Sequence, residues 1–261
     1  MRSVGLGYDA PMARSARAAE VDPTVYPVED KVGEEALQRF ICEMLRPLVE
    51  RYLVQKKVRA FVGADQFVYY RKHDPRGRVA PDVYVLDGVR PGRRIKTWKT
   101  WVEGAPPSLA IEVVSGDVEK DYEKSPERYD ECGVRELIVF DPDHEEERER
   151  IRFQVFRRVG KRGLVRVLAT NADRVPSKVL GCHLVAVGDG EALRLRLGVG
   201  KDGDELFPTE AEAQSAEKEC ALAEKERERA EKERALAEVE RERALRRALE
   251  DELERLRGRR R

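Results

Sequence analysis

Two acidic residues lie inside segments that otherwise have the composition of buried strands. Asp82 opens the run PDVYVLD, and Glu112 sits in the middle of the run LAIEVV. Burying an ionised carboxylate is unfavourable unless a cation, a hydrogen-bond donor or a metal ion compensates it. We therefore expect these two acids to share a partner, and the chemistry of the protein depends on what that partner is.

The chain just after Glu112 supplies further groups that could act with the two acids, namely Asp121, Lys124 and Tyr129. Two carboxylates on neighbouring strands can hold a divalent ion through hard oxygen ligands. Such an ion polarises a phosphoryl oxygen and can lower the pKa of a bound water from about 15.7 to near 7. A lysine beside it can orient the attacking water or stabilise the developing charge. The pattern indicates hydrolysis of a phosphodiester.

Structural roles are an open alternative for most of these residues. Asp82 follows a proline and could cap the end of a strand, Lys124 taken alone would be a solvated lysine, and Tyr129 could pack in the core. Glu112 is harder to explain in this way, because apolar residues flank it on both sides. Glu112 is therefore the best-supported member of the expected site.

The segments that must position these residues are expected to form an α/β or α+β fold with a mixed sheet. Apolar residues recur at three- and four-residue intervals from about 33 to 53, which predicts a helix that Pro47 could kink. A polar helix at about 118–132 is expected to end at Gly133, and Ser125-Pro126 is typical of an N-cap followed by the first helical position. Alternating or continuous apolar residues predict strands within 57–86 and at 108–115, 135–140, 182–187 and 193–197, with a hairpin at 152–168.

The end of the chain is expected to form a separate element. ALAEKERERA at 221–230 returns as ALAEVERERA at 235–244, without proline or glycine before Gly258, which predicts one long charged helix. Its stripe of alanines is thin for a coiled coil, so weak self-association and a solitary helix are both open. We expect a loosely ordered arm at 1–27, a core domain at 28–205 and the helical tail at 206–261.

Composition limits the possible environments and partners. The 51 basic and 51 acidic residues cancel, so the net charge does not indicate a nucleic-acid binder. A local basic segment at 90–99 could nevertheless contact phosphates and stack on bases, or it could be an exposed loop with a packed tryptophan. The cysteines and histidines are few and unclustered, which makes structural zinc improbable and a reducing interior the expected compartment. Without a signal-like or membrane-spanning segment, we expect a cytoplasmic protein with no membrane partner.

The order Pro-Asp, then a glutamate inside an apolar strand, resembles the PD-(D/E)xK nuclease superfamily. The longer pattern PDVYVLDG, LAIEVVS, Asp121, Lys124, Tyr129 and GVRELIVFDP is similar to the Uma-two family of restriction-endonuclease-like proteins. The resemblance covers about residues 28–200, and it implies a restriction-endonuclease-like core with a long C-terminal helix or coiled coil added. One departure is Val114, which stands where the superfamily normally has lysine.

The resemblance also implies a role for each matching residue. It implies that Asp82, Glu112 and Lys124 are catalytic and that Mg²⁺ or Mn²⁺ is the cofactor. The implied metal ligands are Asp82, Glu112, the Val113 carbonyl and Glu35 or its neighbour Glu34, with Asp121, Tyr129 and Ser115 as supporting groups. Nucleic-acid contacts are expected from the basic segment, at Arg93, Arg94, Lys96 and Trp98.

The predicted function is therefore metal-dependent cleavage of phosphodiester bonds, in DNA by resemblance. The alternative is a non-catalytic module that binds nucleic acid or acts as a scaffold and oligomerises through its tail. A homodimer or another oligomer is expected in either case, and the tail is a candidate for binding another protein.

Overall fold

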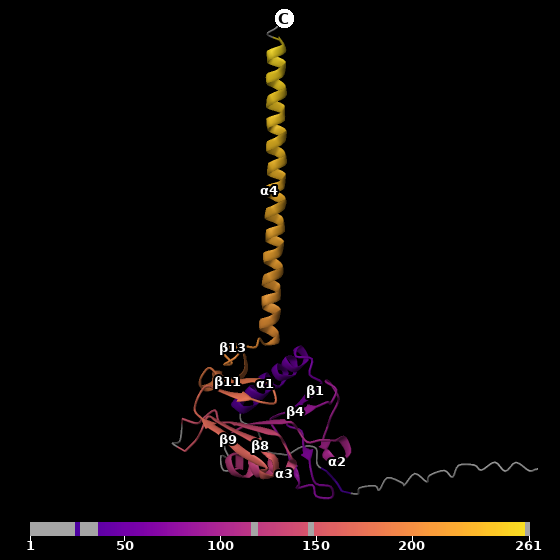
Figure 1. Ribbon diagram of the computed structural model, residues 1–261, viewed down its shortest axis with the longest axis vertical. Helices are drawn as coiled ribbons and strands as arrows, with labels where there is room; N and C mark the ends of the chain where they lie inside the picture. The colour runs from indigo at the N-terminus through magenta and orange to yellow at the C-terminus, as the bar shows by residue number, and fades with distance from the viewer. Residues whose placement is uncertain (1–23, 27–35, 116–119, 146–148, 259–261) are drawn as a thin grey trace, which may run out of the picture.

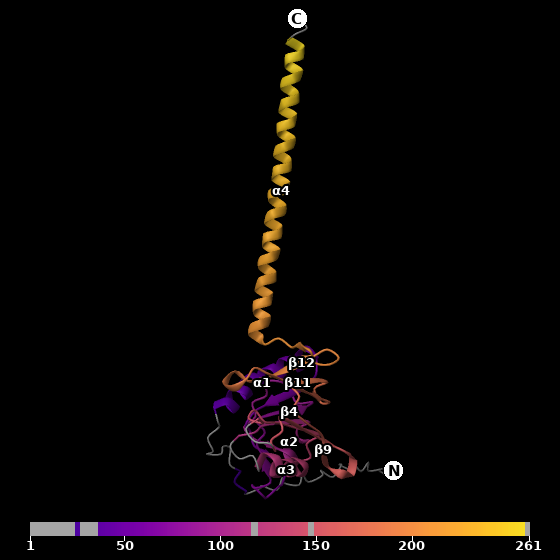
Figure 2. The same ribbon diagram turned by 90° about the vertical axis from the view of Figure 1, so that its left-hand side faces the viewer.

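The computed structural model describes residues 24–26, 36–115, 120–145 and 149–258. Figure 1 shows a layered body from which one long helix projects, and the view turned by 90° in Figure 2 shows the same separation of body and helix. Among the described residues, no helix combines the length and the apolar character that crossing a bilayer requires.

A six-stranded mixed sheet forms the centre of the body, with the strand order β1-β4-β6-β7-β8-β9. Only β6 and β7 run parallel within it, and every other neighbouring pair is antiparallel. The strands are β1 (Ala60–Gly63), β4 (Val83–Asp87), β6 (Leu109–Val113), β7 (Glu136–Phe140), β8 (Phe153–Arg158) and β9 (Leu164–Thr170). The two strands nearest the expected acids, β4 and β6, are therefore direct neighbours in the middle of the sheet.

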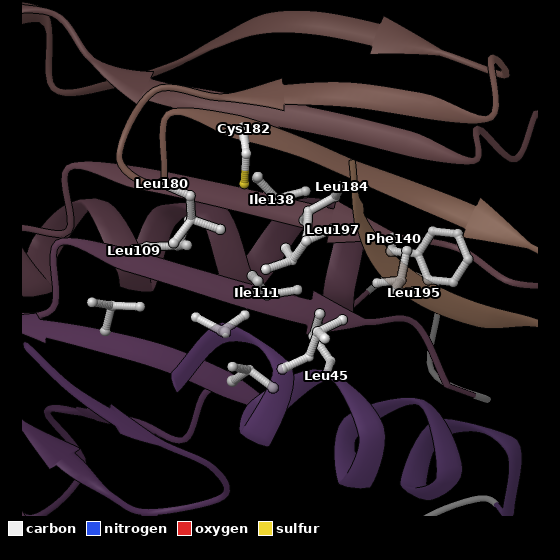
Figure 3. Packing of buried hydrophobic residues seen from close by; sticks show 14 of the residues in the cluster. Leu45, Leu109, Ile111, Ile138, Phe140, Leu180, Cys182, Leu184, Leu195 and Leu197 are labelled. Atoms are coloured by element: carbon white, nitrogen blue, oxygen red, sulfur yellow. The ribbon is translucent and has the colours of Figure 1, made fainter. Parts of the chain in front are cut away.

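One face of this sheet is covered by α1 (Ala36–Gln55) and by a second, four-stranded antiparallel sheet. The labelled side chains in Figure 3 come from α1, the central sheet, the second sheet and the turn between β10 and β11, and they pack in one apolar cluster. The second sheet consists of β10 (Arg174–Ser177), β11 (Cys182–Val187), β12 (Arg194–Val199) and β13 (Glu205–Leu206). Strand β6 contributes Leu109, Ile111 and Val113 to this cluster.

The opposite face carries α3 and a small three-stranded sheet, with a second apolar cluster beneath them. Ala110 of β6 and Val114, the residue after the strand, point to this side, because side chains along a strand alternate between its two faces. The elements here are β2 (Val68–Tyr69), β3 (Arg78–Val79), β5 (Trp98–Lys99), α2 (Thr100–Glu103) and α3 (Ser125–Cys132), with a π-helical turn, η1 (Lys120–Lys124), leading into α3. Short 3-10 turns, η2 (Gly160–Arg162) and η3 (Gly190–Ala192), connect strands elsewhere.

The projecting helix, α4 (Glu210–Gly258), is tied to the body at its first turn. The Thr209 hydroxyl accepts from the Glu212 backbone N–H at 3.3 Å, and the Glu212 carboxylate accepts from the Thr209 N–H at 2.7 Å, which is a reciprocal capping box. Arg196 of β12 pairs with Glu212 at 2.7 Å. Just before the helix, Phe207 is buried against Tyr52 of α1, with ring centroids 5.2 Å apart. At 1.5 Å per residue, the helix extends roughly 70 Å from this anchor.

The mixed α/β class and the long C-terminal helix are confirmed. The main helices and strands fall where the sequence predicts them, and Gly133 does end α3 in a left-handed conformation with a φ of 88°. The prediction for Ser125-Pro126 is wrong. The helical backbone already runs through Lys120–Lys124, so Ser125 is the first residue of α3 and is preceded by Lys124 with helical φ and ψ. Pro126 is therefore the second residue of α3 and follows a helical turn directly.

Candidate active site on strands β4 and β6

The antiparallel register of β4 and β6 brings the two acids together. Val83 pairs with Ile111 and Tyr84 pairs with Ala110, so one further step along the register sets Asp82 opposite Glu112. Residues directly opposite in an antiparallel pair project from the same face of the sheet. For Glu112 this is the face covered by α3, because its neighbours Ile111 and Val113 belong to the cluster on the α1 side. Both acids are nearly buried, at 6% exposure for Asp82 and 8% for Glu112.

Asp82 is held by donors from two different elements. Its Oδ2 accepts from the Val113 backbone N–H at 2.6 Å, and its Oδ1 accepts from Nε2 of Gln38 on α1 at 2.9 Å. The first bond locks the carboxylate to β6 next to Glu112. The second bond comes from α1, the helix on the other face of the sheet, and connects it to Asp82 just before the first residue of β4. Both of these donors are neutral groups, and together they orient the carboxylate.

Glu112 is oriented by Tyr129, whose hydroxyl donates to Oε1 of the carboxylate. Tyr129 lies on α3 and is 2% exposed, so the ring packs in the apolar cluster while its hydroxyl reaches the strand. Burial raises the pKa of Tyr129 well above its ordinary value, and the negative charges of Glu112 and Asp82 raise it further. The hydroxyl therefore keeps its proton and remains a donor to Glu112 throughout the neutral range.

A cavity of about 150 Å³ opens next to Glu112 and Tyr129. It lies between α3 and the β2–β3 hairpin, and its other lining residues are Phe67, Arg78, Val79, Ala80, Ser125 and Arg128. Asp82 is not among the residues that line it. The cavity thus combines one carboxylate, two guanidinium groups and two hydroxyls in a space that a phosphate group could enter.

Lys124 is in a different situation from the two acids. It ends η1 immediately before α3, its side chain is exposed, and it does not line the cavity. The position that would carry a strand lysine is occupied by Val114, which is 1% exposed in the cluster on the α3 side. Lys124 does lie one helical turn before Arg128, so the two residues share a face of the helix.

Other expected site residues are placed only in part. Glu34 and Glu35 lie outside the described residues, as does the side chain of Asp121. Ser115 is half-buried just beyond β6, and it does not line the cavity.

The basic segment at 90–99 differs from the expected phosphate-tracking loop. Trp98 belongs to β5, is 1% exposed and donates from Nε1 to the Ala105 carbonyl at 3.0 Å, so its ring cannot stack on a base. The alternative interpretation, an exposed loop with a packed tryptophan, fits this segment. Arg93 pairs with Glu103 of α2 and lies over the Trp98 ring, whereas Arg94 and Lys96 are exposed.

Mg²⁺ is commonly held by one or two carboxylates, with waters and substrate phosphate oxygens completing its coordination. Asp82 and Glu112 fit that pattern as two hard oxygen donors opposite each other on adjacent strands. Within the described part of the chain, no group of three or more His, Cys, Asp or Glu residues converges.

Three residues near the two acids could not be selected from the sequence. Gln38 lies on a helix in which the periodic pattern marks only the apolar residues, and Gln38 is not one of them. Arg78 and Arg128 are two basic residues among 51 in the chain, and only the packing of the β2–β3 hairpin against α3 brings them to the Glu112 cavity.

The match to a family model identifies the class of protein. Residues 23–186 match the model of the Uma2 family, described as "Putative restriction endonuclease", and the chain belongs to this family. The similarity to the Uma-two family inferred from the motifs is thereby confirmed.

A solved structure also resembles the chain. It is described as "a putative nuclease belonging to DUF820" from Anabaena variabilis, and it is 15% identical, with a TM-score of 0.39. The matched region covers 57% of this chain and 75% of that one. No match was found among curated proteins.

Proposed function

We propose that this protein is a metal-dependent nuclease that hydrolyses phosphodiester bonds, with DNA as the substrate. The observation that carries the proposal is the pairing of Asp82 and Glu112 across β4 and β6, where both carboxylates are nearly buried and individually oriented. Family membership supports the reaction class. DNA, in preference to RNA, rests on the resemblance to restriction endonucleases.

In this proposal Asp82 and Glu112 hold Mg²⁺ or Mn²⁺, with the Val113 carbonyl and Glu35 as further candidate ligands. When bound, the ion supplies Lewis-acid polarisation of the phosphate and activation of water. The protein supplies orientation. Gln38 and the Val113 N–H fix Asp82, and the hydroxyl of Tyr129 fixes Glu112.

Lys124 is proposed to orient the attacking water or to stabilise negative charge as the phosphate is attacked. Its position supports the role only in that it lies at the start of α3, on the same helical face as the cavity residue Arg128. Asp121 and Ser115 are proposed to support this end of the site.

Oligomerisation through α4 is a separate proposal. The helix exposes large apolar side chains at intervals along its length, namely Leu222, Leu236, Val239, Leu245 and Leu249. Alanines at 223, 230, 237 and 244 lie among them at seven-residue spacing, and a second copy of the helix could cover this stripe.

The competing function is a non-catalytic module that binds nucleic acid or acts as a scaffold. One observation favours it: Val114 stands where the superfamily normally has a lysine. It predicts nucleic-acid binding without turnover.

The test is cleavage of plasmid and linear DNA, and of RNA, by the full chain with Mg²⁺, Mn²⁺ or EDTA, alongside calorimetric titration of each ion. Glu112→Gln and Asp82→Asn preserve size and are expected to abolish ion binding and to reduce cleavage by at least about 10²-fold, since several kcal/mol of stabilisation by the ion is lost. Lys124→Ala is expected to reduce the rate by roughly 10²-fold while ion binding persists. Unaltered cleavage by Glu112→Gln, or wild-type protein that neither binds ions nor cleaves, contradicts the proposal.

A further inference from the structure

Two arginines from separate elements converge on the cavity that contains Glu112. Arg78 belongs to β3, and Arg128 belongs to α3, on the opposite wall. They are brought together by the packing of the β2–β3 hairpin against α3. An ion pair from Arg71 to Glu131 at 2.9 Å and a hydrogen bond from the Tyr70 hydroxyl to Glu131 at 3.0 Å fasten that packing. The approach of the two cations is therefore built into the fold.

Arg78 is further fixed by its contact with Phe67. Its guanidinium carbon lies 4.1 Å from the centroid of the Phe67 ring, and this ring is itself 4% exposed and lines the same cavity. A guanidinium that stacks on an aromatic face can donate hydrogen bonds within its own plane. Arg128 is exposed on α3, one residue before Tyr129 and three after Ser125, both of which line the cavity.

The chemistry of the cavity identifies the ligand class. A phosphodiester carries negative charge and would be repelled by Glu112 unless cations accompany it. Guanidinium groups match the geometry of phosphate oxygens through two parallel N–H donors, and such charge-assisted bonds are stronger than neutral ones. The strand position that would otherwise supply a cation is taken by Val114, which is buried in the cluster on the α3 side.

We propose that Arg78 and Arg128 are substrate-contacting residues that bind the non-bridging oxygens of the phosphodiester at the Glu112 cavity. They supply the positive charge that the strand position of Val114 does not. This inference rests on the proposed nuclease function and deepens it by assigning the phosphate-binding groups. It also moves the main contact with nucleic acid from the basic segment at 90–99 to the β2–β3 hairpin and α3.

The test separates binding from cleavage. Arg78→Gln and Arg128→Gln are introduced into the full chain, with Arg162→Gln as a control that removes the same charge from an exposed position away from the cavity. Cleavage is measured in the otherwise wild-type protein. The affinity for a short DNA duplex is measured against salt concentration in a Glu112→Gln background.

Each cavity substitution is expected to reduce cleavage by roughly 10- to 100-fold, as for loss of a hydrogen bond to a charged group. Each is also expected to lower the salt-dependence slope of binding by about 0.9, the value for one phosphate contact on duplex DNA. Arg128→Lys keeps the charge but not the paired donors, so it should restore the slope and only part of the rate. Arg162→Gln should match wild type in both measurements.

Wild-type rates and slopes in both cavity variants would overturn the inference while the nuclease function could still stand. If the wild-type protein never cleaves but both cavity variants lower the binding slope, the proposed function fails and the phosphate-binding assignment is supported. Wild-type protein that neither cleaves nor binds DNA overturns both.

Discussion

The hydroxyl of Tyr129 on α3 donates a hydrogen bond to the carboxylate of Glu112 on β6. This contact links a helix outside the sheet to an acid in its central strand, and the same carboxylate is set opposite Asp82 by the strand register. A buried carboxylate is usually neutralised or paired. One partner of Glu112 is a tyrosine whose raised pKa keeps it protonated, so that its hydroxyl remains a hydrogen-bond donor.

Tyr129→Phe is expected to weaken divalent-ion binding by roughly 10- to 100-fold, because groups that orient a ligand contribute about this much to metal affinity. Unfolding should become easier by about 1–3 kcal/mol, since a buried carboxylate loses a donor. Tyr84→Phe is the matched control, because it removes another buried hydroxyl, one that bonds Gln66 at 2.6 Å. The control should lose stability but not ion affinity, as measured by calorimetry and urea denaturation. Equal ion affinities in all three proteins would mean that Tyr129 does not position Glu112.

The free energy of unfolding is expected to fall as the pH rises above about 9. Burial raises the pKa of the Cys182 thiol to about 11 and that of the Cys132 thiol to about 12, and it raises the pKa of Tyr52 to about 12. A group whose pKa is raised by folding holds its proton more tightly in the folded state. Its contribution is complete below the unfolded pKa and is lost as the pH rises toward the folded pKa, at up to about 1.4 kcal/mol per pH unit for each group.

Urea denaturation at pH 8, 9, 10 and 10.5 measures this decline. Cys182→Ala should make it shallower between pH 9 and 10.5, because one of the titrating groups is gone. Cys220→Ala changes an exposed thiol on α4 and should leave the slope unaltered. A wild-type stability that stays constant over this range would show that burial of these groups does not control the alkaline limit.

Asp141→Ala is expected to destabilise the protein by about 3 kcal/mol, because the buried guanidinium of Arg150 loses its close ion pair with Asp141 and keeps the longer one with Asp143, at 3.7 Å. Asp141 is 0% and Arg150 8% exposed, and Nε of Arg150 donates to Asp141 at 2.8 Å. Asp141 also accepts from the hydroxyl of Tyr122 at 2.6 Å, which fastens η1, the turn that ends at Lys124.

The control for this pair is Glu43→Ala, which breaks an exposed ion pair with Arg39 and should change stability by at most about 1 kcal/mol. Thermal and urea unfolding give both values. If Asp141→Ala costs no more than Glu43→Ala, the buried pair is not a determinant of stability.

Truncation after Pro208 removes α4 and tests the self-association proposal. The body should remain folded, because Phe207 and its contact with Tyr52 are retained. Light scattering coupled to size-exclusion chromatography should then give a monomer, where the full chain gives a dimer or larger oligomer. A truncated protein that remains dimeric places the interface in the body, and a monomeric full chain removes the proposal.

The sequence by itself determined the main helices and strands, though not β5, α2, β10 or β13, and it singled out the two acids. Glu112 could be selected because a lone carboxylate in an apolar strand is energetically unusual, and the period of two is a local property of the chain. The tail helix could be predicted because helix propensity and the absence of proline and glycine are also local. Residues without such a local signal, such as Gln38, could not be found in this way.

Only the tertiary structure decided which groups surround the acids. The register between β4 and β6 sets Asp82 opposite Glu112, and the packing of α3 brings Tyr129, Arg128 and, from the facing hairpin, Arg78 to one cavity. It also buries Trp98, which the sequence alone allowed to be a stacking platform. These outcomes depend on contacts between segments that are far apart in the chain. Residue type and spacing are compatible with many such contacts, and strand register and packing select the ones that form.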